Sequence, residues 1–323
     1  MMPNTVVPSL YNTLTWGAEL EMTGGTRAQA AKIIASHFRT TASHIGGPYD
    51  KYEIIENGRK WSVVSDSSIT PLKRVNGRLT SASANYKVEL VSPPLVGGQA
   101  IDGYQEIIRK LRANGFIISE NCGFHVHIGI RDIPPKALVH LLNQVHSKQN
   151  LIFKALGINP NNTPRYRYCS AIPTRLVENL KKQKAETLEQ IATIWYETLS
   201  STYGMNQHYD HSRYHIINLT RGLVPSSPYY LGTAEFRCFS ATLHAGKLRA
   251  YIQFCLLIIA YCASIKKSSY KSTVVADGES EAYKLRCFFL KLGCIGEQFK
   301  TMRLHWLDNF GSQSKAWRRG QQL

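Results

Sequence analysis

The sequence predicts an α+β fold in which helices cover one face of an antiparallel sheet. Helical and strand-like segments are interleaved along the 323 residues. Polar and apolar residues alternate within several strands, as is typical of antiparallel sheets with one covered face. The Asn76-Gly77 step in PLKRVNGRLT is the strongest short-range signal for a β-hairpin. These observations favour an antiparallel sheet over a doubly wound parallel one.

The strands are expected where this alternation runs between turn signals. One of them stops at Pro93-Pro94, because proline cannot donate a ladder hydrogen bond. In chain order, strands are expected at 14–22, 60–66, 85–92, 116–130, 213–219 and 233–240, with the hairpin at 71–80.

The helices are expected where apolar residues recur at helical spacing. Asn114-Gly115 and Gly157 are typical helix C-terminal signals, and Pro134-Pro135 opens a helix. The apolar run FCLLIIAYCA is shorter than the roughly 17–25 residues of a membrane span, so it predicts a buried core helix and no membrane association. Helices are expected at 27–39, 99–113, 135–156, 174–199 and 245–265.

Composition limits the protein class and the partners. Seven cysteines without a CxxC pair and an N-terminus without a secretion signal predict a reduced, cytoplasmic environment. A net charge of +17 favours anionic partners. Nucleic acid is possible but not favoured, because no nucleic-acid-binding motif is recognisable. Residues 1–265 are expected to form the main domain, and 266–323 a helical extension with a basic tail in the same compact unit.

Four of the expected strands share one pattern, an ionisable pair at positions i and i+2 opposite an apolar face. The pairs are Glu19 and Glu21 in GAELEM, Lys87 and Glu89 in YKVELV, His125 and His127 in CGFHVHIG, and Glu235 and Arg237 in AEFRCF. The alternative is a half-exposed sheet whose polar face meets water. If the four strands share one sheet, however, four carboxylates and two imidazoles converge on one concavity.

Carboxylates crowded in this way raise each other's pKa values, and divalent cations relieve the conflict. A glutamate-dominated site suits Mg²⁺ or Mn²⁺. With a nearby arginine and lysine, such a site has what phosphoryl transfer from ATP requires. The sequence contains no Walker A, GxGxxG or HExxH motif, so any metal ions are expected on strand carboxylates.

The order of motifs resembles that of the amidoligase family, which is related to glutamine synthetase and glutamate–cysteine ligase. The matching order is GxExE, W…DxS, ExxSPP, CGxHVH, RY and EFR, over about residues 14–265. The resemblance implies that residues 1–265 are a glutamine-synthetase-like catalytic domain with a curved half-barrel sheet and helices on its outer face. It also implies ATP-dependent joining of a carboxylate to an amine through an acyl phosphate, with ATP and two Mg²⁺ or Mn²⁺ ions as cofactors.

The resemblance assigns the residues of the metal and nucleotide sites. The implied metal ligands are Glu19, Glu21, Glu89, His125 and Glu235. His127 and Lys87 would lie at the nucleotide. Arg237 would stabilise the transferred phosphoryl group. Asp66 would lie near the incoming amine, although Ser67 replaces the glycine that the family has after this aspartate.

Residues in PRYRYC and RYHIINL are candidates for holding the carboxylate substrate, because arginine binds carboxylates through two hydrogen bonds. These candidates are Arg165, Arg167, Arg213 and Asn218. The arginines could equally contribute only to the surface charge. The amine and carboxylate partners could be small molecules, peptides or protein side chains. The open alternatives are a metal-dependent phosphotransferase or hydrolase acting on an anionic polymer, and a basic nucleic-acid-binding protein without catalysis.

Overall fold

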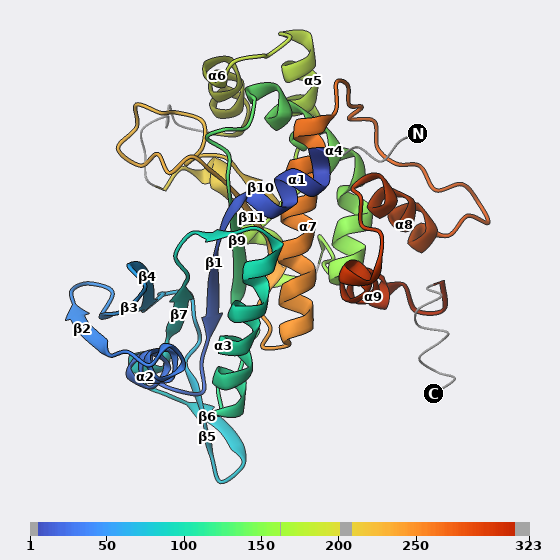
Figure 1. The fold of residues 1–323 in the computed structure, drawn as a ribbon. Helices are drawn as coiled ribbons and strands as arrows, with labels where there is room; N and C mark the ends of the chain where they lie inside the picture. The colour runs from blue at the N-terminus through green and yellow to red at the C-terminus, as the bar shows by residue number, and fades with distance from the viewer. Residues whose placement is uncertain (1–5, 162, 201–208, 314–323) are drawn as a thin grey trace.

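The computed structural model describes residues 6–161, 163–200 and 209–313 (Figure 1). Its strands are β1 Thr15–Met22, β2 Ala42–Gly46, β3 Lys51–Glu56, β4 Arg59–Val64, β5 Leu72–Val75, β6 Arg78–Ser81, β7 Val88–Val91, β8 Leu95–Val96, β9 Gly123–Gly129, β10 Ile217–Asn218 and β11 Thr233–Ser240. Its α-helices are α1 Val6–Thr13, α2 Arg27–Phe38, α3 Ile101–Ala113, α4 Pro135–Leu156, α5 Thr174–Lys182, α6 Leu188–Leu199, α7 Ala245–Ser264, α8 Glu281–Lys291 and α9 Lys300–Leu307. The 3-10 helices are η1 Ala84–Tyr86, η2 Gly98–Ala100, η3 Pro164–Tyr168, η4 His211–Arg213, η5 Glu297–Phe299 and η6 Asp308–Gln313.

A nine-stranded sheet is the centre of the molecule. Its strand order is β10-β11-β9-β1-β7-β4-β3-β2, with β8 paired to β1, and every pairing between these strands is antiparallel. The predicted α+β class with a large antiparallel sheet is therefore confirmed. The four strands that carry the ionisable pairs, β11, β9, β1 and β7, are neighbours in this sheet.

Helices cover the apolar face of the sheet (Figure 1). Leu20, Leu90, Phe124 and Val126 are completely buried on this face because alternate residues of each strand point toward the helices. The helix α7 packs against β9 and is surrounded by α1, α3, α4 and α9. It is long and apolar enough to cross a membrane, yet two thirds of its most apolar stretch is buried inside the molecule, as expected for a core helix.

Local sequence signals set several helix ends as predicted. Thr26 caps α2 in a capping box with Gln29, so the first free backbone N–H groups of that helix are satisfied. Gly157 ends α4 with a φ of 68°, a conformation that favours glycine. The prediction of one helix over 174–199 is wrong. Lys184 adopts a φ of 50°, and Thr187 starts a new helix in a second capping box with Gln190, so the chain forms α5 and α6.

Three predicted strands are shorter than expected. The segment before β9 turns at Ser119, whose carbonyl accepts the Cys122 N–H, and only Ile117 forms an isolated bridge, to Thr23. The 3-10 helix η1 replaces the start of the strand expected at 85–92, so Lys87 lies outside β7. Of the strand expected at 213–219, only the two residues of β10 join the main sheet, because η4 precedes them, and His215 forms an isolated bridge to Ser170.

The chain after α7 returns along α4. Ser268 Oγ contacts His140 Nδ1 at 2.7 Å, and the carbonyl of Tyr270 contacts His146 Nδ1 at 2.7 Å. One or two short helices are expected after this linker, and the structure has two, α8 and α9. The basic tail, with Arg318 and Arg319, lies outside the described residues. The division at residue 265 stays a prediction.

Candidate functional site

The register of the four central strands brings their ionisable side chains together. Glu19 of β1 lies opposite His125 of β9, and Glu21 lies opposite Glu89 of β7. Glu235 of β11 lies opposite His127. Directly opposed residues in an antiparallel sheet point to the same face. The face that is not covered by the apolar core therefore carries all of these groups side by side.

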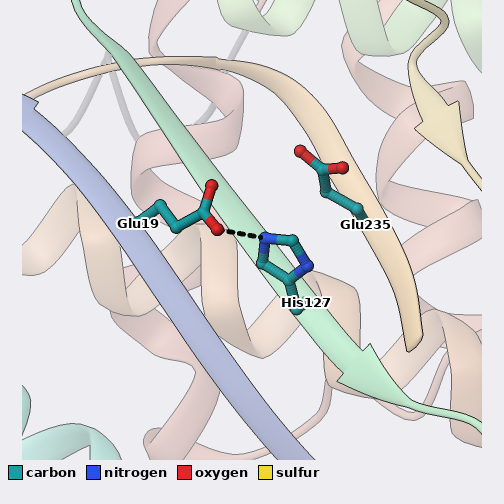
Figure 2. A group of neighbouring side chains, drawn as sticks. All are labelled: Glu19, His127 and Glu235. Carbon is teal, nitrogen blue, oxygen red and sulfur yellow. Dashed lines mark ion pairs between the residues drawn. The ribbon is translucent and has the colours of Figure 1, made fainter. Parts of the chain in front are cut away.

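Glu19, His127 and Glu235 form a first ligand group, with ligand atoms within 4.8 Å of one another. Figure 2 shows the three side chains, from β1, β9 and β11, pointing toward a shared space. His127 Nε2 lies 3.2 Å from Glu19 Oε1 as an ion pair (Figure 2). This contact lacks hydrogen-bond geometry, so His127 Nε2 is a buried nitrogen without a hydrogen-bond partner.

Positive charges surround the first ligand group. Arg237 forms an ion pair with Glu235 through Nη1, and Asn218 Nδ2 donates to Glu235 Oε2 at 2.6 Å. Burial would raise the pKa of Glu235, but Arg237 and His127 outweigh it and lower the pKa to about 2. Burial likewise opposes ionisation of Glu19, yet His127 and His125 hold its pKa well below the usual value. Both carboxylates are therefore ionised at neutral pH.

His125 adjoins this group and contacts both of its carboxylates, since its Nδ1 also lies 3.6 Å from Glu235 Oε1. Its Nε2 accepts a hydrogen bond from Arg165 Nη2 at 2.9 Å, and its Nδ1 lies 3.2 Å from Glu19 Oε2. Burial, and then the Arg237 charge, lower its pKa to about 4, so the ring is neutral with its proton on Nδ1. The assignments of His125 as a metal ligand and His127 as a nucleotide neighbour stay predictions. Arg165 occupies Nε2 of His125, and His127 lies in the first ligand group.

Glu21, Asp66 and Glu89 form a second ligand group, again with ligand atoms within 4.8 Å. Asp66 follows β4 in a loop, where its Oδ1 accepts the Ser68 N–H at 2.6 Å. Burial raises the pKa of Glu21 to about 7, although the Gly123 N–H, 2.6 Å from Oε2, opposes the rise. Burial and then the charge of Glu19 raise the pKa of Glu89 well above its usual value.

The two ligand groups fit divalent cations. The buried Nε2 of His127, which lies near Glu19 but has no hydrogen-bond partner, is a ligand atom available to a cation in the first group. Burial and neighbouring carboxylates raise the pKa values of Glu21 and Glu89, and a cation at the second group would offset both effects. Mostly carboxylate oxygens with one imidazole match the preference of Mg²⁺ or Mn²⁺. Asp66, which the sequence placed near an amine, is thus also positioned as a possible cation ligand.

Two cavities lie on this face of the sheet and meet at Glu19. One is a polar cleft of about 580 Å³ whose walls include Glu21, Asp66 and Glu89. The other is a mostly apolar cavity of about 710 Å³ that reaches His127 from the far end of β1. The apolar cavity is also lined by Leu10, Leu14, Trp16, Ile133 and Leu231. The first ligand group therefore stands where the two cavities meet, and the second lines the polar cleft.

Only some of the predicted substrate-binding residues line the polar cleft. Arg165 and Arg213 line the polar cleft, as does Lys87, whose Nζ donates to the carbonyl of Ser67 at 2.6 Å. The prediction for Arg167 is not supported, because its side chain is exposed, lies over the Tyr168 ring and is not among the cleft-lining residues. Asn218 is buried and orients Glu235.

The polar cleft also contains tyrosines that were not predicted as site residues. Tyr49, Tyr168, Tyr209 and Tyr214 line it, and the Arg213 guanidinium lies 5.2 Å from the Tyr209 ring centre and 5.6 Å from that of Tyr214. The hydroxyls of Tyr49 and Tyr209 are 3.4 Å apart, although the residues are distant in sequence. The arginine–tyrosine steps in PRYRYC and RYHIINL were the available signal for Tyr168 and Tyr214, whereas Tyr49 and Tyr209 lie outside both motifs.

Structural comparison finds distant similarity to ligases. A bifunctional glutathione synthetase from Pasteurella multocida matches with 12% identity and a TM-score of 0.45, over 98% of this chain and 50% of that one. The ligase PafA, in its complex with the prokaryotic ubiquitin-like protein Pup, matches with 13% identity and a TM-score of 0.36, over 97% of this chain and 65% of that one. This chain thus spans about half and about two thirds of their respective lengths. No curated protein matches the sequence.

The sequence itself gives a more direct result. The model of the family described as "Putative amidoligase enzyme" matches residues 12–259. This range begins before β1 and ends within α7, so it includes both ligand groups and the strands that hold them. With most of its length matched, this chain belongs to the amidoligase family.

Proposed function

We propose that this protein is an ATP-dependent carboxylate–amine ligase that forms an amide through an acyl phosphate. The observation that carries the proposal is the pair of ligand groups on neighbouring strands, one where an apolar cavity meets a polar cleft and one within that cleft. A reaction between a nucleotide and two further substrates needs separate spaces that meet at a charged centre.

The two cavities suit different substrates. The apolar walls of the larger cavity are suited to the base of ATP, with the polyphosphate directed toward Glu19 and His127. The polar cleft is suited to the acid and the amine, because Arg165 and Arg213 provide cations that bind a carboxylate. Arg237, which lines the same cleft beside Glu235, is placed to balance charge on the transferred phosphoryl group.

The side chains would divide two cations between them. Glu19, His127 and Glu235 would hold one, and Glu21, Glu89 and Asp66 the other. Divalent cations at these positions would neutralise phosphate oxygens. His125 then acts as a positioning residue: its Nδ1–H faces Glu19, and Arg165 keeps its ring in that tautomer.

The proposed chemistry has two steps. A carboxylate oxygen of the acid forms a bond to the γ-phosphorus of ATP as the bond to the bridging oxygen breaks, and ADP leaves. The amine nitrogen then attacks the acyl carbon, the acyl–oxygen bond breaks, and phosphate and a proton are released. Binding both substrates in one cleft lowers the entropic cost of the second step.

Trapping the acyl phosphate tests this proposal without knowledge of the natural amine. Hydroxylamine converts an acyl phosphate into a hydroxamate, so Mg-ATP, hydroxylamine and a panel of amino acids and short peptides should give hydroxamate together with ADP. Glu89→Gln keeps the shape of the side chain and should lower the rate at least about a hundredfold, since it removes a ligand of the charged centre. Glu106→Gln, on the exposed face of α3, should leave the rate unchanged.

Three results would contradict the proposal or part of it. One is ATP hydrolysis at the same rate with or without a carboxylate compound, which would indicate a phosphohydrolase. Another is full turnover by Glu89→Gln, which would show that the second ligand group takes no part. Absence of Mg-ATP binding in calorimetry would show that the apolar cavity is not a nucleotide site.

A further inference from the structure

A basic hairpin, β5 and β6 with their turn, residues 72–81, stands apart from the main sheet. It forms its own two-stranded sheet and extends below the other strands in Figure 1. Asn76 and Gly77 both have positive φ values, as a two-residue hairpin turn requires. An isolated hairpin is marginally stable, but this one is anchored at its base by hydrogen bonds between Leu72 and both Thr23 and Gly24.

The hairpin carries unbalanced positive charge. Residues 67–88 contain Lys73, Arg74, Arg78 and Lys87 and no acidic residue. Arg74 Nη1 donates only to the Gly77 carbonyl, at 3.2 Å, which leaves its charge uncompensated. Within the described residues, no acid lies within ion-pair distance of the three hairpin cations. Unpaired exposed cations on a projecting element attract a polyanion.

Other features of the hairpin favour a polypeptide over a nucleic acid. Val75 and Leu79 are 44% and 51% exposed among the cations. The outer edge of β6 has no strand partner in the described part of the chain, so its backbone is free to pair with an added strand. None of residues 72–81 is aromatic, whereas proteins that bind single-stranded nucleic acid stack its bases on aromatic side chains.

The hairpin is inserted between two segments that line the polar cleft. Residues 65–68 precede it, and Ala84 and Lys87 follow it. The hydrogen bond from Lys87 Nζ to the Ser67 carbonyl joins these two flanks beneath the hairpin. A chain bound along the hairpin therefore lies next to the cleft entrance.

We infer that the basic hairpin docks an acidic, extended polypeptide, and that this polypeptide presents its reacting group to the polar cleft. The second half of this inference rests on the proposed ligase function, whereas the docking does not. Acidic side chains pair with Lys73, Arg74 and Arg78, while apolar side chains between them cover Val75 and Leu79.

Fluorescence anisotropy without ATP tests the docking separately from catalysis. The probes are a labelled peptide of alternating glutamate and valine, its lysine–valine counterpart, and a single-stranded oligonucleotide of matched charge. Replacing Lys73, Arg74 and Arg78 with glutamine should weaken binding of the acidic peptide about tenfold, as expected from three modest ion pairs. The matched control replaces the exposed Lys181, Lys182 and Lys184 with glutamine, which removes the same charge and should change affinity less than twofold.

Equal weakening by both triple variants would overturn the inference, because it would assign binding to net charge alone. Preferential, hairpin-dependent binding of the oligonucleotide would also overturn it and identify nucleic acid as the partner. If the unsubstituted protein binds the acidic peptide but forms no hydroxamate, the ligase proposal is refuted and the docking inference is unaffected.

Discussion

The two ligand groups contain similar residues but differ in electrostatic balance. The first has Arg237, His127 and His125 around Glu19 and Glu235, so the pKa values of both carboxyls are lowered. The second has only carboxyls at its centre, and the pKa values of Glu21 and Glu89 are raised. The first group is therefore stable without a cation, whereas the second gains most from one. Three substitutions test this difference.

Glu235→Gln should have the largest effect on the fold. It leaves the guanidinium of Arg237, 5% exposed, without its buried partner. Removing one member of a buried ion pair typically costs about 3 kcal/mol or more. Urea unfolding without divalent cations measures this loss. An effect no larger than that of the surface variant Glu106→Gln would show that the first group is not held by this ion pair.

Gly123→Ala should have an intermediate effect and acts between the two groups. An added Cβ would lie 2.3 Å from Arg165 Nη1, so the guanidinium must move away from His125. We expect a loss of about 1–2 kcal/mol in the free energy of unfolding. Gly103→Ala, in α3 with open space around the new Cβ, is the control and should be neutral or stabilising. Equal effects of the two substitutions would show that the close approach of Gly123 to Arg165 does not contribute to stability.

Glu89→Gln should have the smallest effect on the fold and the clearest effect on cation binding. Burial and the charge of Glu19 raise the pKa of Glu89 and so favour its neutral form without a cation, and we expect glutamine to replace it at a cost below about 1 kcal/mol. Thermal unfolding with and without Mg²⁺ measures the effect on cation binding. The stabilisation by Mg²⁺ should be much smaller in the variant than in the unsubstituted protein. A Mg²⁺ effect equal to that of the natural chain would mean that the second group does not bind the ion.

The sequence predicted the central strands and their ionisable pairs because a period of two determines which side chains share a face. It also placed the helix ends at Asn114-Gly115 and Gly157 close to their observed positions. Strand register is a tertiary property, however. Both histidines lie at Glu19 and Glu235, and the difference between them is that Arg165, carried by a 3-10 helix far along the chain, occupies Nε2 of His125.

Loops limited the prediction of the site in the same way. Asp66 joins the second ligand group, and Tyr49 and Tyr209 meet across the cleft, through loop conformations that no periodicity encodes. Arg165 and Arg167 both lie in the short helix η3, on different sides of it. The first is buried and the second exposed, although their sequence contexts are nearly identical. The break between α5 and α6 was similarly hidden by a continuous apolar stripe.

Glu19 borders both the apolar cavity and the polar cleft. A ligand that changes the position or charge of this carboxylate from one side changes the surface offered to the ligand on the other. Thermodynamic linkage then requires reciprocity: whatever factor the first ligand applies to the affinity of the second, the second applies to the first. One side chain of β1 thus gives the two binding spaces a common energetic coupling, measurable by titrating each ligand in the presence of the other.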